Sequence, residues 1–543
     1  MPGLPGGASA AARPGGGIGA AAGRAALLVA IGTFGSKLLG FARDTVLADR
    51  FGSGPLPAAY FVAAQIPLVL FAAVGVGIGT VFIPVLSGRL AAGGRAAAEH
   101  FAANVNGVVT LVTALLIVSL ELGAGLAVRV MGGGFNAHER QLAIVMVRIM
   151  SPLILFYAWS AILGGVLNVL GVFGPNAAMG IPQNLVIIGA IVWGSLGGRH
   201  RITDVAWGGL VGTLLTVLVQ WPALRRARFR LGLRLDVHDP HLRRLAVLVI
   251  PAALTVMAQQ LAVVVDKLLA SYLGGVLLSD LTYAGRLQIL AYSILGLSVS
   301  TVVYPRLATA ASQTSMAGFR HTLLRGLGLV NFVTIPLVVG LFLLRSQVVR
   351  VLFQHGAFGA PQTVQTAYAL GFFTLGTLGF AWQDYLNRAF FAMQDTRQPL
   401  RGSAVAMAVT VGLDLLLVGP MRQGGLALGT ALGWTAGASF LAVSMRLRLG
   451  SLGLRALAGG MVRTLLAALA AFVPAVLIVS PLSAALGHGW IGAASALGLV
   501  LILAVGLYAA ACRVLWVREL ADAAGLFQSL WRRLHGLIPT GRA

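Results

Sequence analysis

Long apolar stretches run along almost the whole chain and are broken only by short clusters of glycine, proline or arginine. A membrane-spanning helix needs about 20 mostly apolar residues. The sequence predicts fourteen such spans, near residues 25–48, 58–87, 102–130, 142–171, 177–197, 204–224, 245–273, 279–308, 323–345, 366–393, 400–420, 424–447, 461–481 and 489–514. The short alternating segments of a membrane barrel are absent from the sequence. We therefore expect an all-α polytopic membrane protein.

The composition agrees with this interpretation. Of 543 residues, 58% are hydrophobic and only 10% are charged, whereas a soluble domain has about a quarter of its residues charged. This balance excludes most soluble enzymes. The chain has one cysteine, Cys512, so it has no intrachain disulfide.

The basic residues are distributed unevenly between the two sides of the membrane. The side that carries both termini receives most of the arginines, including those of the loop 225–244 and of the C-terminal tail. Because cytoplasmic loops carry an excess of Lys and Arg, we expect both termini to be cytoplasmic. The net charge of +24 is then a topology signal, and nucleic acid is not needed as a partner to explain it.

An internal repeat divides the predicted spans into two groups. Residues 44–52 resemble residues 266–274, and residues 80–86 resemble residues 301–307. Each repeat contains six spans, an even number, so the two halves have the same orientation. Parallel repeats are common in transporters, with the substrate site between them. The sequence therefore predicts two parallel six-helix lobes plus two extra C-terminal helices.

The predicted boundaries follow from the repeat and from changes in composition. They are a disordered Gly/Ala/Pro-rich tail at 1–23, an N-lobe at 24–224, a basic cytoplasmic loop at 225–244, a C-lobe at 245–448, spans 13 and 14 at 449–514, and a cytoplasmic amphipathic tail on the membrane surface at 515–543.

Charged residues inside predicted spans are the candidate functional groups, because each costs about 2.5–3.5 kcal/mol on insertion scales. The set is Lys37, Arg43, Asp44, Glu121, Arg148, Asp266, Lys267, Arg286, Asp384, Arg388 and Asp414. Several fixed cations favour an anionic substrate, and arginine suits phosphate because its planar fork donates two hydrogen bonds. Two structural alternatives remain open. Arg43 and Asp44 could form an interfacial pair, and Arg286 could pair with Asp280 or Asp266.

The two carboxylates of the second half also allow two interpretations. Asp266 and Asp414 could share a hard cation with hydroxyl or carbonyl oxygens, or each could hydrogen-bond a neighbouring helix. No catalytic constellation is recognisable in the sequence, and no phosphate-binding loop of the nucleotide-hydrolysing type is present. These observations favour a transporter over an enzyme.

A series of motifs resembles one family. The segments are Leu38–Asp44 followed by Phe51–Gly54, Tyr283–Leu287, Leu352–Phe358, Gln394–Pro399 and Gly425–Thr430. In order and spacing they are similar to the MurJ/MviN lipid II flippases of the multidrug/oligosaccharidyl-lipid/polysaccharide exporter superfamily. The resemblance covers nearly the whole chain.

The resemblance implies a function and a set of sites. It implies alternating access that moves lipid II, the undecaprenyl-diphosphate-linked peptidoglycan precursor, from the inner to the outer leaflet of the bacterial plasma membrane. Spans 13 and 14 would form a groove for the lipid tail, and membrane lipids and cell-wall synthesis proteins would be partners. The implied substrate-binding residues are Lys37, Arg43, Asp44 and Arg286. The implied ligands of a sodium coupling ion are Asp266, Thr410, Asp414, the Leu426 carbonyl and Thr430, with no other cofactor.

Span 2 departs from the family pattern. Gln65, Ala72 and Val76 stand where the family usually has a lysine, an arginine and a glutamate. Two alternatives therefore stay open at this point: a flippase or exporter for another lipid-linked oligosaccharide, and a non-transporting cell-wall scaffold. A soluble cationic drug as substrate is disfavoured by Lys37, Arg43 and Arg286.

Overall fold

The computed structural model describes residues 16–196, 201–236, 253, 256–257, 260–312, 316–450, 454–487, 489–523 and 525. Within these residues all regular elements are helices, and no strand occurs. Ten helices of the described chain are long and apolar enough to cross a membrane. The predicted all-α fold is confirmed.

The first half of the chain forms the helices of the N-lobe. They are α1 (Gly16–Phe51), α2 (Pro55–Gly77), the π-helix η1 (Ile78–Phe82), α3 (Ile83–Met131), α4 (Ala137–Met150), α5 (Leu153–Val169), α6 (Gly174–Ala178), α7 (Gly180–Ser195) and α8 (Ile202–Arg226). Gly94 interrupts α3 with a non-helical backbone (φ 67°, ψ −166°). The break at Gly94 therefore separates the predicted spans 2 and 3.

The second half forms the C-lobe and the C-terminal pair. It contains the helical segment 260–272. The remaining helices are α10 (Gly275–Ser312), α11 (Met316–Leu343), α12 (Arg345–Phe353), α13 (Ala360–Ala392), α14 (Arg397–Met421), α15 (Gln423–Leu449), α16 (Leu454–Ala485) and α17 (Trp490–Val514).

Four helices match predicted spans but fall outside the ten apolar ones. They are α1, the segment 260–272, α10 and α13. Each carries charged residues that the sequence places in the membrane: Lys37, Arg43 and Asp44 on α1, Asp266 and Lys267 on 260–272, Arg286 on α10, and Asp384 and Arg388 on α13.

The internal repeat is visible in the backbone. Gly52 follows the end of α1 and Gly274 follows the end of the segment 260–272, and both have positive φ, 67° and 97°. Glycine adopts this left-handed conformation at little cost. The repeated Asp-to-Gly segments therefore end equivalent helices, and α2 and α10 begin directly after them.

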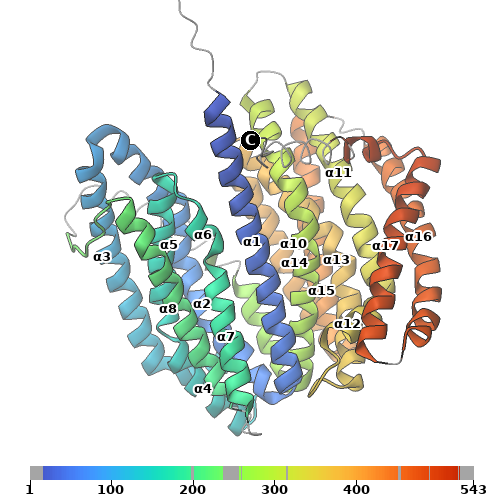
Figure 1. Cartoon of the computed structure of the whole chain (residues 1–543), viewed down its shortest axis with the longest axis horizontal. Helices are drawn as coiled ribbons and strands as arrows, with labels where there is room; N and C mark the ends of the chain where they lie inside the picture. Colours follow the sequence, from blue (N-terminus) through green and yellow to red (C-terminus); the bar gives the residue numbers. More distant parts are fainter. Residues whose placement is uncertain are drawn as a thin grey trace, which may run out of the picture.

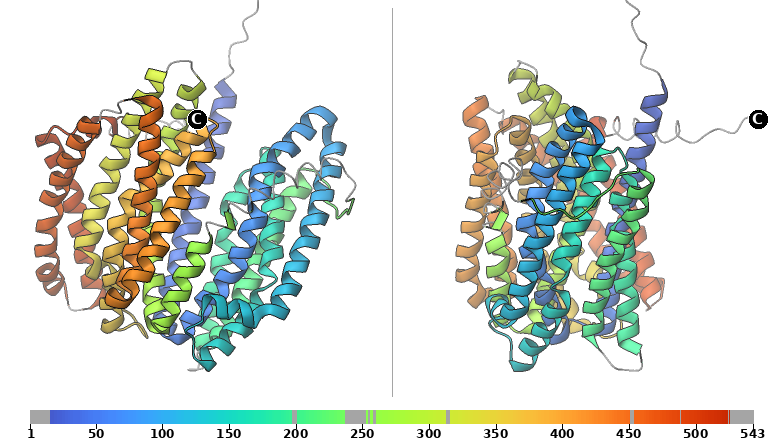
Figure 2. Two further views of the ribbon diagram at one scale, coloured as in Figure 1. Left: turned by 180° about the vertical axis from the view of Figure 1, so that it is seen from behind. Right: turned by 90° about the vertical axis from the view of Figure 1, so that its left-hand side faces the viewer.

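The two lobes are separate bundles inclined toward each other, and they approach most closely at the end where α1 finishes (Figure 1, Figure 2). The start of α1 and the end of α17 both lie at the opposite end of the molecule (Figure 1). The pair α16–α17 packs on α11 of the C-lobe through a buried cluster that includes Phe332, Phe472 and Tyr508. The Tyr508 hydroxyl donates to the Phe332 carbonyl at 2.8 Å.

Three predicted peripheral segments are partly described. α1 begins at Gly16, inside the predicted disordered tail 1–23, and residues 1–15 lie outside the described residues. The first part of the basic loop runs along α3, where the Arg234 N–H donates to the Ala103 carbonyl at 3.0 Å. Residues 237–244 lie outside the described part. In the tail, Asp522 pairs with Arg325 of α11, and the predicted surface helix beyond 525 is not described.

Candidate substrate site between the two lobes

Hydrogen bonds to backbone carbonyls join the two lobes at the end of α1. The Ala357 N–H donates to the Asp49 carbonyl at 2.7 Å. The Tyr283 hydroxyl donates to the Gly52 carbonyl at 3.1 Å, and the Ser279 hydroxyl donates to the Gly54 carbonyl at 3.1 Å. We call these contacts the lobe seal.

Aromatic side chains surround the ring of Tyr283, whose hydroxyl belongs to the lobe seal. The Tyr283 ring is fully buried and lies 5.2 Å from Phe61 of α2, 5.3 Å from Phe353 of α12 and 5.8 Å from Phe358, measured between ring centroids. A Cβ atom on Gly52 would lie 2.7 Å from the Ala357 carbonyl oxygen. The seal therefore needs glycine at position 52 for its backbone conformation and for its close approach.

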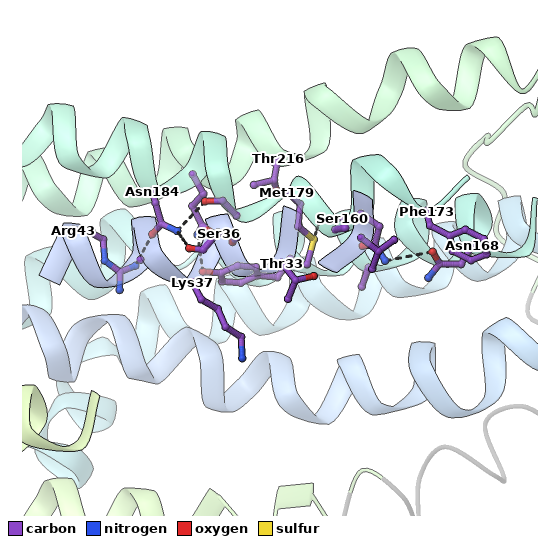
Figure 3. A pocket seen from close by; sticks show the side chains of 18 of the residues that line it. Thr33, Ser36, Lys37, Arg43, Ser160, Asn168, Phe173, Met179, Asn184 and Thr216 are labelled. Carbon is purple, nitrogen blue, oxygen red and sulfur yellow. Dashed lines mark hydrogen bonds between the residues drawn. The ribbon is translucent and has the colours of Figure 1, made fainter. Parts of the chain in front are cut away.

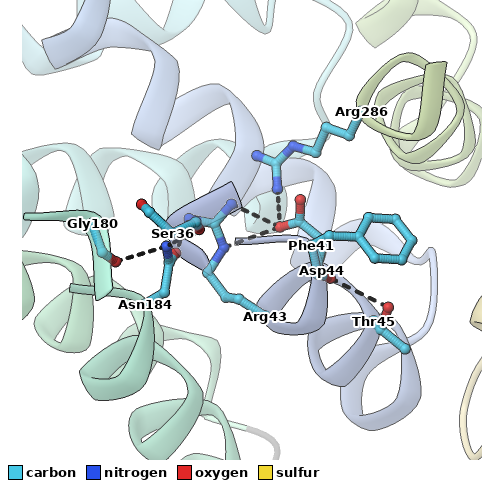
Figure 4. A network of polar contacts seen from close by, with 8 residues as sticks. All are labelled: Ser36, Phe41, Arg43, Asp44, Thr45, Gly180, Asn184 and Arg286. Atoms are coloured by element: carbon cyan, nitrogen blue, oxygen red, sulfur yellow. Dashed lines mark hydrogen bonds and ion pairs between the residues drawn. The ribbon is translucent and has the colours of Figure 1, made fainter. Parts of the chain in front are cut away.

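Next to the seal, one carboxylate joins two arginines from opposite lobes (Figure 4). The Asp44 Oδ1 atom accepts from Arg43 Nη2 at 2.9 Å and from Arg43 Nε at 3.1 Å. The same oxygen accepts from Arg286 Nη1 of α10. Asp44 is buried, with 6% of its side chain exposed, while the side chains of Arg43 and Arg286 are 23% and 30% exposed. Three of the four predicted substrate residues thus meet at one point.

These contacts show how both arginines are paired in the described chain. Arg43 and Asp44 form a buried pair between the lobes, and Arg43 Nη1 also donates to Asn184 Oδ1 at 3.2 Å. Among the residues that the structure describes, Arg286 forms its ion pair with Asp44, and none joins it to Asp280 or Asp266. The Arg286 guanidinium also lies 4.6 Å from the centre of the Phe61 ring. Arg286 therefore contacts the N-lobe through an ion pair and through one aromatic ring.

A cavity of about 810 Å³ continues from this network into the N-lobe (Figure 3). Its wall on α1 carries Lys37 and Arg43. In the described chain, Lys37 has no hydrogen bond or ion pair, and it extends from α1 away from Asn184 (Figure 3). An ammonium held this way is free to bind an anion.

The rest of the wall is uncharged and carries a set of polar groups that sequence reasoning missed. It contributes hydroxyls and amides from α5 to α8, namely Tyr157, Ser160, Asn168, Asn176, Gln183, Asn184 and Thr216. Gln183 Nε2 donates to Tyr157 Oη at 3.0 Å and to Thr213 Oγ1 at 2.9 Å. The signal that could have found this wall is the occurrence of uncharged amides inside apolar spans, which are costly unless they are paired.

The C-lobe carboxylates lie where the two helices α14 and α15 are packed through glycine. Asp414 is fully buried, and both of its carboxylate oxygens have no hydrogen-bond partner among the described residues. A Cβ atom on Gly429 would overlap Asp414 Oδ1, and one on Gly433 would overlap Thr410 Oγ1. Asp414 therefore lies against the stretch of α15 that carries Leu426 and Thr430.

Asp266 belongs to the same region. Its Oδ1 atom is buried without a partner in the described chain, and it is close enough to Asp414 for the two carboxylates to interact electrostatically. Its neighbour Lys267 donates from Nζ to Thr282 Oγ1 at 2.7 Å and is also close enough to Asp266 for the two charges to interact. Asp414, with both oxygens buried and unpaired in the described chain, therefore needs a positive charge or a proton nearby, because burial disfavours the ionised form.

Comparison with known families identifies the chain. Residues 47–497 match the family model described as "Lipid II flippase MurJ". The chain belongs to the MurJ family. A MurJ relative from Rhizobium tropici, named "Probable lipid II flippase MurJ", is 32% identical over 410 residues, which is 74% of this chain and 77% of the relative. A Burkholderia cenocepacia protein named "Lipid II flippase MurJ" is 27% identical over 432 residues, with 78% and 84% covered.

Solved structures agree with the MurJ fold. A structure titled "Lipid II flippase MurJ, inward closed conformation" superposes with a TM-score of 0.76 and 23% identity, covering 91% of this chain and all of the other. A multidrug resistance MATE transporter in an inward-facing conformation has a TM-score of 0.66 at 15% identity, with 79% and 98% covered. The chain is thus a multi-pass membrane protein with the fold of MurJ.

Proposed function

We propose that this protein is a lipid II flippase of the plasma membrane that works by alternating access. The observation that carries the proposal is the meeting of Arg43 and Arg286 at Asp44, beside a cavity whose wall also carries Lys37, in a chain of the MurJ family. With both termini cytoplasmic, as the arginine distribution favours, the lobe seal faces outward and the cavity is entered from the cytoplasm.

The diphosphate of lipid II binds to the three cations. In the sealed state Asp44 accepts hydrogen bonds from both Arg43 and Arg286. A diphosphate has more negative charge and more acceptor oxygens than one carboxylate, and guanidinium groups bind such oxygens through two parallel hydrogen bonds. Substrate therefore competes with Asp44 for Arg286. Because the Asp44–Arg286 contact joins the lobes, its loss weakens the closed state.

Opening then requires separation of the lobe seal. In its three hydrogen bonds, backbone carbonyls of the N-lobe accept from the Ala357 N–H and from the Tyr283 and Ser279 hydroxyls of the C-lobe. Each such bond contributes about 0.5–1.5 kcal/mol net, so the seal is reversible. Rocking of the two lobes exposes the headgroup to the outside, and no covalent chemistry is needed.

Asp266, Thr410, Asp414, Thr430 and the Leu426 carbonyl form the proposed sodium site. The unpaired oxygens of Asp414 and Asp266 fit a hard cation. A bound cation would supply the positive charge that lets both carboxylates stay ionised inside the C-lobe. These residues would hold the ion between α14, α15 and the segment 260–272, and its binding would then be coupled to the packing of the C-lobe.

The pair α16–α17 is proposed to guide the polyprenyl tail. Large apolar side chains on both helices are exposed, including Leu477 at 72% and Ile502 at 71%. The pair is held on α11 and leaves the N-lobe free to move. Membrane lipids contact the same surface. Proteins of cell-wall synthesis are the expected protein partners.

Reconstitution tests the proposal. Purified protein in liposomes that contain labelled lipid II should speed the transfer of the label between leaflets, and Arg286→Ala should abolish that transfer. Arg225→Ala at the end of α8, whose guanidinium lies 5.9 Å from the Trp221 ring, is the matched control and should retain it. Transfer by Arg286→Ala at the wild-type rate would contradict the site, and no transfer by the wild-type protein would contradict the function.

A further inference from the structure

A second cavity lies inside the C-lobe and has no role in the mechanism described so far. It measures about 260 Å³ and is formed by α13, α14 and α15. Its lining includes Asp384, one of the intramembrane charges with no assigned role, together with Gln383 and Asn387 of the same helix. Ligand pockets for drug-sized molecules measure about 300–1,000 Å³. This cavity has room for one ring rather than for a whole headgroup.

Aromatic rings form one side of the cavity. Phe380 and Trp434 line it, with their ring centroids 4.9 Å apart. Tyr292 of α10 meets the Phe380 ring edge to face, also at 4.9 Å. Phe380 and Trp434 are only partly buried, so part of the surface of each side chain is free to contact a ligand. An aromatic face attracts the weakly positive C–H groups of a ligand.

The charged residues at the cavity compensate each other. Arg388 Nε and Nη2 donate to the two carboxylate oxygens of Asp384, both at 3.2 Å, and the Tyr292 hydroxyl donates to Asp384 Oδ2 at 3.2 Å. Asp384 and Arg388 are 30% and 40% exposed. The pair adds no net charge and offers donors and acceptors side by side, which suits a neutral ligand that carries many hydroxyl or amide groups.

Amide groups complete the lining. Asn387 Oδ1 is buried and has no hydrogen-bond partner among the described residues. A buried acceptor without a partner costs free energy, so this amide stands at the cavity with unused hydrogen-bonding capacity. Gln383, which is 9% exposed, and Ser403 of α14 add further polar groups to the same cavity.

The cavity lies within reach of the proposed diphosphate site. Tyr292 follows Arg286 by six residues on α10, a rise of about 9 Å along the helix axis. A sugar directly attached to a diphosphate at Arg286 extends over a comparable distance. The helix direction places Tyr292 on the side of Arg286 away from the lobe seal, which is the side from which the headgroup enters.

We propose that the C-lobe cavity lined by Phe380, Trp434, Gln383, Asn387 and Asp384, with Arg388 paired to Asp384, binds a sugar ring of the lipid-linked substrate. The aromatic face packs against the C–H face of the ring, and the amides and the ion pair bind its hydroxyl and N-acetyl groups. This inference rests on the proposed flippase function. It adds a site that discriminates sugar-bearing lipids from bare lipid diphosphates.

Binding measurements on the full-length protein in nanodiscs test the inference with three probes. These are undecaprenyl diphosphate, the same lipid bearing the N-acetylated disaccharide without peptide, and complete lipid II. Wild-type protein should bind both sugar-bearing lipids more tightly than the bare diphosphate. Trp434→Ala should weaken the binding of both sugar-bearing lipids about tenfold, through the loss of one aromatic contact and its buried area, and should leave the bare lipid unchanged.

A second variant and a control keep the test decisive. Asn387→Leu keeps a similar side-chain volume and removes the amide. Like Trp434→Ala, it should weaken the binding of both sugar-bearing lipids. Trp193→Ala, at a position of α7 that is 70% exposed, should change none of the three affinities. Thermal unfolding is measured for each variant.

Three results would overturn the inference. Wild-type affinity of both cavity variants for the sugar-bearing lipids would do so. If the cavity variants weakened the binding of complete lipid II but not of the disaccharide lipid without peptide, the cavity would bind the peptide and not a sugar. Failure of wild-type protein to bind any of the three lipids would overturn the proposed function, and the sugar site with it.

Discussion

Substitution of Asp44 by asparagine should open the lobe seal. The amide keeps the shape of the side chain but removes its charge. In the native protein one oxygen of Asp44 accepts from both Arg43 and Arg286. Asparagine leaves two guanidinium groups facing each other across the lobe contact without a counter-charge. The sealed state is therefore destabilised relative to the open state.

The size of the effect follows from the contacts. A hydrogen bond to a charged group contributes about 1.5–3 kcal/mol. Asp44 is only 6% exposed, but the Arg286 side chain is 30% exposed, and solvent reduces the strength of such pairs. The contact of Arg286 with Phe61 remains. We therefore expect a loss of about 2 kcal/mol, which shifts the equilibrium between sealed and open states by roughly 30-fold.

Labelling of a cysteine in the seal measures this shift. Ser53 is 2% exposed in the sealed state, so Ser53→Cys, in a background with Cys512→Ala, reports opening to a membrane-impermeant maleimide. Asp44→Asn should increase the labelling rate roughly 30-fold when opening and closing are fast relative to labelling. Arg225→Ala should not change it. A labelling rate equal to that of the parent would refute the role of Asp44 as the inter-lobe bridge.

Three further outcomes are expected. Sodium, but not potassium, should raise the melting temperature of the purified protein, and Asp414→Ala should remove this effect; a sodium response that survives the substitution would contradict the site. Gly429→Ala should also remove it, because the added Cβ overlaps Asp414 Oδ1, whereas Gly419→Ala, which meets open space, should keep the sodium response. Deletion of residues 456–543 should leave a folded core that binds short-chain analogues but does not move polyprenyl substrates in liposomes, and normal transfer by the truncated protein would exclude a tail groove.

The sequence by itself determined the helical character of the chain, the approximate positions of the helices and the repeat. Apolar runs of about 20 residues specify membrane helices, because every backbone polar group must be paired inside a bilayer. The matched Asp-to-Gly segments ended at Gly52 and Gly274, where positive φ favours glycine. Local spacing also makes the Asp384–Arg388 pair predictable, since residues four apart share a helix face.

Only the tertiary structure decided which charges meet. Asp44 and Arg286 are 242 residues apart, and Arg286 had several acids within reach by sequence. Its partner depends on the rotation of α10 and on the tilt of one lobe against the other, which no local pattern records. Only the tertiary structure also shows the amide groups that line the N-lobe cavity and the glycines of α15 that pack against Asp414 and Thr410. Hydrophobic periodicity determines which residues enter the membrane, whereas the close packing of whole helices determines which of them touch.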